Sequence, residues 1–327
     1  MIRWRRFFAD RQNWLGLIIV GLFIIAAVTA PWLAPQPDDG EPSPFKVVGQ
    51  RLDRAPNPPS AEHPLGTVPQ INLLPRFGIA PGQDASYQWD VYHTLIWGTR
   101  SALRFGIVVT LVTAAVGVLV GAVSGYAGGA VNGLMMRMTD AFLVFPPIAA
   151  VWLFNRLLFT RVLAPFVELP ELSWWENVLY QLEIDPVMLA LIAFSWMPYA
   201  RIINANVSWL KQEEYVLAAR SIGAAGPRIL FHHLLPNAIT PAVVLAARDV
   251  GGLVILATAF IFIGIGGNVA WGILLVGARD YIIGIGGNPL SHWWVFLPVS
   301  LALTLFGIDW NLLGDGLNTV LNPRARR

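Results

Sequence analysis

The sequence predicts an all-α protein that crosses a membrane six times. Of its 327 residues, 55% are hydrophobic and only 13% are charged, whereas a soluble domain carries about 25% charged residues. A chain with so little charge cannot cover a water-facing surface, which excludes a soluble globular enzyme and favours lipid as the solvent. The hydrophobic residues also fall in long runs separated by polar connections.

Each apolar run is long enough for a helix to cross roughly 30 Å of hydrocarbon, which takes about 20 residues. The first, Trp14 to Leu33, follows four arginines. A cleaved signal peptide is the alternative here, but its apolar core is usually about 7–15 residues. We therefore interpret the run as a membrane helix. The remaining runs are 102–125, 134–159, 187–209, 237–266 and 293–314.

Composition divides the chain into three regions. Residues 1–34 form an N-terminal tail and the first membrane helix. Residues 35–95 are rich in Pro, Gly and Asp and predict an irregular segment outside the membrane, and 96–327 form a five-helix core with a polar loop at 210–236. The core helices contain many small residues, which let helices approach closely in lipid: Gly117, Gly121, Gly125, Gly128 and Gly129.

The basic residues predict the orientation, because cytoplasmic connections carry an excess of Lys and Arg. With the N-terminus inside, the inside segments hold Arg3, Arg5, Arg6, Arg11, Arg137, Arg201, Lys211, Arg220, Arg228, Arg324, Arg326 and Arg327. The outside connection at 156–186 is mostly acidic. Both termini and the 210–236 loop are therefore expected in the cytoplasm.

Several chemistries are excluded by residue type. The chain has no cysteine, hence no disulfide and no thiolate ligand or nucleophile. Neither of its lysines, Lys46 and Lys211, stands in a phosphate-binding Gly-x-x-x-x-Gly-Lys-Ser/Thr context, so any ATP must be bound by another subunit. His232 and His233 are adjacent and would point apart on a helix, so no metal site is expected. No basic stripe indicates nucleic acid.

The polar loop predicts a helical hairpin. One helix face is formed by residues spaced i, i+3, i+4 and i+7: Tyr215, Ala218, Ala219 and Ile222. Gly223 would end this helix, Pro227 would begin a second one, and Pro236 would close it. A small, Ala-rich face suits the groove of a partner, although packing back onto the bundle explains it equally well.

Three charged residues fall inside predicted spans, where charge is costly and usually faces a cavity or a partner. They are Arg248, Asp249 and Asp309. We hypothesise that Arg248 pairs with Asp309 near a translocation path, with Asp249 facing substrate or a second subunit. A purely structural ion pair is the alternative.

Several motifs resemble permease subunits of ATP-binding-cassette importers, in the dipeptide, oligopeptide and nickel branch. The loop pattern Ala218-Ala219-x-x-x-Gly223 followed by Leu235-Pro236 resembles the E-A-A loop of that family. Further motifs occur in the same order as in the branch: AEHPLGT at 61–67, GYAGG at 125–129, RMTDAFLVFPP at 137–147 and WNLLGDGLNTVLNPR at 310–324.

The resemblance implies a type I importer permease fold in a prokaryotic cytoplasmic membrane, with no cofactor of its own. It implies three kinds of partner besides membrane lipid: a second permease as a heterodimer, two cytoplasmic ATPase subunits and an external substrate-binding protein. The coupling loop would dock on the ATPase through Glu214, Tyr215, Leu217, Ala218, Ala219, Gly223, Leu235 and Pro236. Leu217 departs from the family, which has Glu at that position.

The chain is thus expected to be a non-catalytic permease subunit that couples ATPase closure to alternating access, for peptides or related small solutes. The alternative is a stand-alone secondary transporter or channel, which would need its own coupling carboxylates. Only Asp249 and Asp309 are candidates for that role. The external segments 68–90 and 160–186 also depart from the family pattern.

Overall fold

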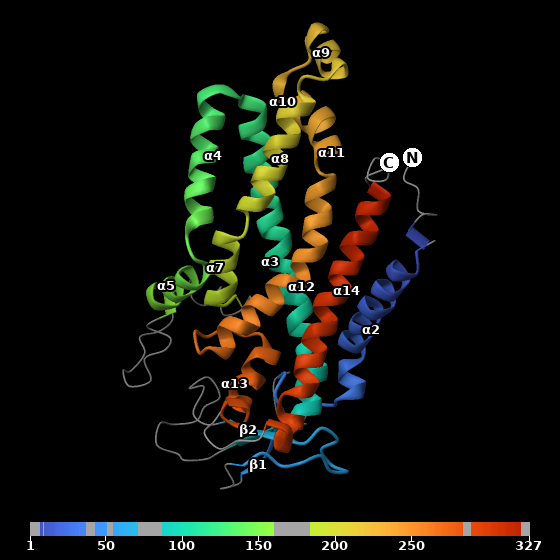
Figure 1. The fold of residues 1–327 in the computed structure, drawn as a ribbon, viewed down its shortest axis with the longest axis vertical. Coiled ribbons are helices and arrows are strands. Elements are labelled where there is room, and N and C mark those ends of the chain that lie inside the picture. The colour runs from blue at the N-terminus through green and yellow to red at the C-terminus, as the bar shows by residue number, and fades with distance from the viewer. Residues whose placement is uncertain are drawn as a thin grey trace.

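The computed structural model describes residues 7–8, 10–36, 43–50, 55–70, 87–159, 184–283 and 289–321. The described part is an elongated bundle of helices with a small sheet at one end and a helical hairpin at the other (Figure 1). We call these the sheet end and the hairpin end. Most of the 68–90 and 160–186 segments, which the sequence singles out, lie outside the described residues.

Five helical segments of the described chain are long and apolar enough to cross a membrane. They are α2 (Arg11–Leu33), α3 (Val91–Ala127), the consecutive helices α7 (Pro186–Phe194) and α8 (Met197–Leu210), α12 (Thr240–Phe262) and α14 (Leu297–Leu321). A bent pair, α4 (Gly129–Val144) and α5 (Pro147–Phe159), supplies a sixth candidate span. The predicted all-α, six-span architecture is confirmed.

The predicted single helix at 134–159 is instead broken. The axes of α4 and α5 differ by 84°, and the break falls at Phe145, which is extended at φ −70° and ψ 124°. Pro146 and Pro147 follow it. A proline disfavours helical backbone in the residue before it and cannot donate to the preceding turn, so two in succession end the first helix and begin the second.

The segment that the sequence predicts as irregular contains a small antiparallel sheet. Its strands β1 (Val47–Gln50), β2 (Thr67–Gln70) and β3 (Tyr87–Asp90) lie in the order β1-β3-β2. Four-residue strands far apart in the sequence give little periodic signal, which explains why composition alone missed them. Asp90 joins this sheet to α3, because its carboxylate accepts hydrogen bonds from the His93 amide at 2.9 Å and from His63 at 2.7 Å.

The sheet end is closed by α13 (Ala270–Ile283) and by the short 3-10 helix η3 (Pro289–Val295). The main core lies between these elements and the spans. At its centre Phe306 of α14 makes edge contacts with Phe23 of α2 and with the fully buried Trp271 of α13. The first span is thereby fixed to the rest of the bundle.

A seam of glycines joins α3 to α8. A Cβ placed on Gly117 or Gly121 would overlap the backbone carbonyl of Trp196 or Ala200, and one on Gly125 would lie 2.9 Å from the carbonyl of Asn204. Both helices advance by four residues from one contact to the next, as neighbouring turns on one helix face do. The predicted role of these glycines in close helix packing is confirmed; Gly128 and Gly129 instead have positive φ at the turn before α4.

Candidate functional site

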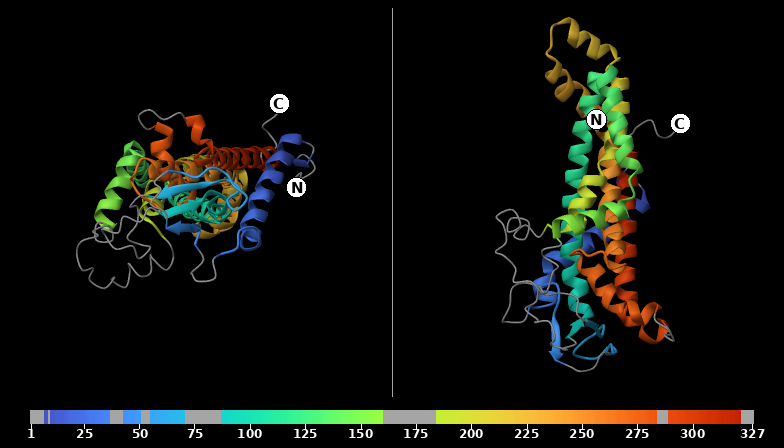
Figure 2. Two further views of the ribbon diagram at one scale, coloured as in Figure 1. Left: turned by 90° about the horizontal axis from the view of Figure 1, so that it is seen from below. Right: turned by 90° about the vertical axis from the view of Figure 1, so that its left-hand side faces the viewer.

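The polar loop forms the predicted hairpin at the tip of the molecule. Its first arm is α9 (Glu214–Ser221), and its second runs through α10 (Gly226–Arg228), the π-helix η2 (Ile229–Leu234) and α11 (Leu235–Ala238) into α12. The hairpin projects beyond the ends of α3 and α4 (Figure 2, right panel). Glu214 lies exposed in the first turn of α9, where the positive end of the helix dipole favours a carboxylate.

One face of α9 is buried against the hairpin's second arm. Val216 and Ala219 are buried and share a hydrophobic cluster with Ile229, Leu230 and Leu234 of η2. The same cluster continues into α3 and α8. The alternative in which the hairpin packs on its own bundle is therefore correct for this face, and Ala219 belongs to it rather than to a free surface.

An adjacent face of α9 is open. Tyr215 is 40% exposed and Ile222 is 85% exposed, and Ala218 between them is exposed as well. These three residues, spaced i, i+3 and i+7, form a stripe along one side of the helix. Partial burial raises the pKa of the Tyr215 hydroxyl, and the Asn237 side chain hydrogen-bonds to it. The hydroxyl is therefore neutral at physiological pH.

The turn of the hairpin requires glycine. Gly223 has φ +84°, in the left-handed region, and a Cβ there would meet nothing within 4 Å. Glycine is therefore favoured at this position because of its backbone conformation, and not because a side chain would lack room. The Ala224 amide then donates to the Ala219 carbonyl at 3.0 Å, which closes the end of α9 as predicted.

Pro236 does not close the second helix, and that prediction is wrong. The chain stays helical through α11 and enters α12. The wider π-helical turn of η2 lies directly before Leu235 and Pro236. A proline clashes with the carbonyl four residues earlier in an ordinary α-helix, and a π-helical turn is one way in which a helix accommodates such a defect.

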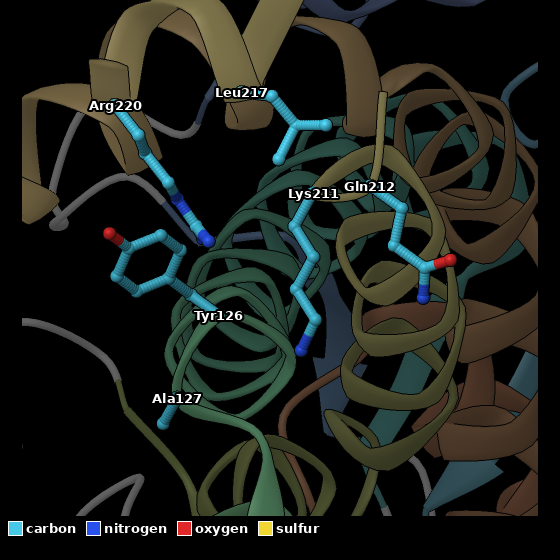
Figure 3. Close-up of a pocket in the computed structure, with 6 residues that line it drawn as sticks. All are labelled: Tyr126, Ala127, Lys211, Gln212, Leu217 and Arg220. Atoms are coloured by element: carbon cyan, nitrogen blue, oxygen red, sulfur yellow. The ribbon is translucent and has the colours of Figure 1, made fainter. Parts of the chain in front are cut away.

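Leu217 lies 50% exposed at the rim of an open hollow at the base of the hairpin. The hollow, about 580 Å³, is lined by Tyr126 and Ala127 from the end of α3, Lys211 and Gln212 after α8, and Leu217 and Arg220 from α9 (Figure 3). In the sequence, Tyr126 is notable only as part of the GYAGG motif. No local sequence pattern indicates that α3, the residues after α8 and α9 meet at this hollow.

The predicted pair between Arg248 and Asp309 is wrong. The Arg248 guanidinium bonds to the carboxylate of Asp315, and their side chains are 44% and 57% exposed. Asp309 is fully buried, accepts a hydrogen bond from the Trp310 amide at 2.6 Å, and its other carboxylate oxygen has no partner among the described residues. Asp315 was missed although it lies in the WNLLGDGLNTVLNPR motif, since its position near the end of a span gave no reason to expect a partner.

Asp249 is held by a neighbouring helix. The Tyr199 hydroxyl of α8 donates to its carboxylate at 2.6 Å, and Tyr199 is completely buried. This bond ties α8 to α12 across the middle of the core. It was not predicted, because no sequence periodicity relates residues fifty positions apart.

The fold and the hairpin together define a class: a multi-pass α-helical membrane protein with a structured hairpin projecting from its bundle. Comparison with known families gives the identity within that class. The chain belongs to the family of inner membrane components of binding-protein-dependent transport systems, which matches residues 117–327. Residues 2–56 match the N-terminal transmembrane domain of oligopeptide transport permease C.

Similar proteins cover nearly the whole chain. The dipeptide transport system permease protein DppC of Bacillus subtilis is 29% identical over 99% of this chain and 85% of its own length. The oligopeptide transport system permease protein OppC of the same organism is 27% identical over 98% and 88%. The nickel transport system permease protein NikC of Escherichia coli is 28% identical over 94% and 93%.

The chain is therefore a non-catalytic, multi-pass inner-membrane permease subunit of an ATP-driven importer. A family of this kind implies two sorts of partner, an ATPase and a substrate-binding protein. The stand-alone transporter alternative is thereby set aside.

Proposed function

We propose that the hairpin from Glu214 to Leu235 is the element through which this permease receives the movement of its ATPase subunits. The observation that carries the proposal is the two-sided character of α9. Val216 and Ala219 anchor one side in the cluster shared with α3 and α8, while Tyr215, Ala218 and Ile222 leave the other side open at the tip. A surface anchored in this way can pass a push on its open side to the spans.

We infer that the open side docks in a groove of a cytoplasmic ATPase subunit. An amphipathic helix laid into a groove is a recurring mode of recognition, and the small Ala218 side chain in the middle of the stripe permits close approach. Closure of two such ATPases would then move α3 and α8 together, since the glycine seam leaves no room between them.

We propose that both termini and the hairpin are cytoplasmic and the sheet end is external. In support, α2 begins and α14 ends toward the hairpin end (Figure 1), and the basic residues of the connections concentrate there. On this proposal the 1–34, 35–95 and 96–327 regions are an N-terminal anchor, an external segment and the transport core. A second, different permease would complete the pore, with lipid around it.

The substrate that the relatives' names favour is a peptide. DppC and OppC are named for dipeptides and oligopeptides, and NikC for nickel. We propose peptides or related small solutes as the cargo. The external binding protein would carry out most of the selection.

We propose that Arg248 and Asp315 lie beside the translocation path or the second permease. The pair is about half exposed on the surface of two largely apolar helices. Charge facing hydrocarbon is costly, so an aqueous or protein neighbour is favoured. Asp249 and Asp309 are also proposed to lie near this path, on the core side of the same helices.

The docking proposal is tested with Ala218→Arg, which places a long charged side chain in the middle of the open stripe. We expect ATPase binding and ATP-dependent uptake to fall at least about tenfold, as they do when a close-packed interface centre is disrupted. The matched control is Ala130→Arg, at another exposed alanine, on α4 near the same end. Unchanged binding in Ala218→Arg would show that the hairpin does not dock.

A further inference from the structure

The hollow at the base of the hairpin carries two cations and no anion. Lys211 and Arg220 both line it, and none of its six lining residues is acidic. Figure 3 shows the two side chains reaching toward the end of α3 from different elements, with the Tyr126 ring beside Arg220. Within the described residues neither cation has an ion-pair partner. The hollow is therefore an electropositive site that lacks a counter-charge of its own.

The contacts of the two cations leave charge available. The Lys211 ammonium donates to the Gly125 carbonyl at 2.8 Å, near the negative end of the α3 dipole, and an ammonium has two further donors. The Arg220 guanidinium lies 5.8 Å from the centre of the Tyr126 ring. A guanidinium carries five N–H donors in one plane, the arrangement that binds a carboxylate.

The helix that carries Arg220 offers it no acidic neighbour. Side chains three and four positions apart meet on a helix, and on the N-terminal side those positions of α9 hold Val216 and Leu217. Beyond Arg220 they fall at Gly223 and Ala224, after the helix has ended. A glutamate at position 217 would be well placed to pair with Arg220, and leucine removes that pairing. Among the described residues, Arg220 therefore has no anionic partner.

The position of the hollow disfavours a lipid headgroup. The Trp97 indole donates to the Ala34 carbonyl at 2.8 Å, so α3 at Trp97 is level with the end of α2. From there to Ala127, α3 rises about 45 Å at about 1.5 Å per residue. The 23 residues of α2 cover only about 34 Å. The hollow thus lies roughly 10 Å beyond the level at which the first span begins.

We propose that this hollow receives a carboxylate side chain, Asp or Glu, from the docked ATPase subunit, held between Arg220 and Lys211 at the rim formed by Leu217. The inference rests on the proposed docking of the hairpin and adds its chemical specificity. Charge-assisted, in-plane bonds from an arginine to a carboxylate are directional, so the contact fixes the angle at which the ATPase sits. It would also make the permease select an ATPase with an acidic residue at that place.

The test measures ATPase affinity for the complete permease pair in lipid nanodiscs. Arg220→Gln should weaken binding by about tenfold, the loss expected when one charge-assisted contact is removed, while Arg220→Lys should keep most of it. Arg228→Gln is the matched control, because Arg228 is exposed on the same hairpin but does not line the hollow. It should change binding less than about twofold, as a peripheral charge does.

A charge-reversal variant gives the decisive experiment. Arg220→Glu should abolish binding, and a lysine substitution at one acidic position of the ATPase surface should restore it. All measurements are made both in phosphatidylcholine alone and with added phosphatidylglycerol. If Arg220→Gln matters only with the anionic lipid, the ligand is a headgroup and the proposal is overturned. Equal affinities for Arg220→Gln and Arg228→Gln would also overturn it.

The outcomes distinguish a failure of the docking proposal from a failure of the carboxylate contact. If Ala218→Arg abolishes ATPase binding while Arg220→Gln leaves it unchanged, the hairpin docks but the carboxylate contact is absent. If Ala218→Arg has no effect, docking itself is wrong, and the inference about the hollow falls with it.

Discussion

Gly223 is the residue on which the shape of the hairpin most directly depends. Its φ of +84° is costly for any residue with a Cβ, and the turn it makes brings η2 back under α9. That return places Val216 and Ala219 in the core and leaves Ala218 exposed. At this scale a single backbone conformation determines which side of α9 can meet a partner.

Replacement of Gly223 should therefore act through conformation alone. We expect Gly223→Val to destabilise the hairpin by about 1–2 kcal/mol, the cost of a left-handed L-residue. Gly223→Asn should cost much less, because asparagine adopts this conformation more readily. Hydrogen exchange of the α9 amides measures the difference. Equal protection in the two variants would contradict the account.

The residue predictions succeeded where a local pattern determines the outcome. The end of α9 at Gly223 follows from the preference of helix ends for glycine, and the sequence shows it. The sequence could not predict which side of α9 is buried and which is open. Periodicity shows which residues share a helix face, but not whether another element covers that face. The wrong partner for Arg248 has a similar cause: Asp309 and Asp315 lie on the same helix, and the sequence does not show that Arg248 packs against Gly314, next to Asp315.

At the scale of elements, the α3–α8 seam holds the hairpin to the spans. Three glycines on α3 face consecutive turns of α8, and at the same end Asn204 donates to Ser124 at 2.7 Å and to Asn132 at 2.6 Å. The small residues gave a correct sequence prediction of close packing. Which helix they meet could not be predicted, because lipid-facing and helix-facing sides are equally apolar.

The seam predicts that a glycine-to-alanine change destabilises the protein inside the seam but not outside it. Gly117→Ala should destabilise the protein by roughly 1–3 kcal/mol, since the added methyl group overlaps the Trp196 carbonyl and overpacking costs about that much. Gly133→Ala in α4 is the control, because a Cβ there meets nothing within 4 Å. It should be neutral or slightly stabilising. Thermal inactivation midpoints in detergent compare the two, and equal midpoints would argue against the seam.

The bond between α12 and α14 predicts a charge-swap rescue. Replacing Arg248 by Asp or Asp315 by Arg leaves two like charges side by side, which an apolar helix pair tolerates poorly. The double variant restores the pair in reverse and should recover more folded protein than either single change. The yield after size-exclusion chromatography measures this. A double variant no better than the singles would mean that the bond contributes nothing.

At the scale of the whole molecule, the sheet end and the hairpin end have different constructions. The sheet end is closed by β1-β3-β2, α13 and η3 over an aromatic core, and the hairpin end stands open and projects (Figure 1). The six candidate spans and the projecting loop could be predicted from hydrophobic runs of membrane length, whereas limits such as the start of α3 at Val91 could not. The short sheet and the α4–α5 bend could not, because they depend on pairing across long sequence separations and on two adjacent prolines within an apolar run.

The central claim is that the open side of α9 meets the ATPase, and the absence of cysteine from the chain permits a direct test. A photoreactive benzophenone maleimide is attached to Ala218→Cys in the assembled importer, and Ala130→Cys serves as the matched exposed position. The account predicts an ATPase adduct from position 218, altered in amount by ATP, and none from position 130. No ATPase adduct from position 218, or equal adducts from both positions, would contradict it.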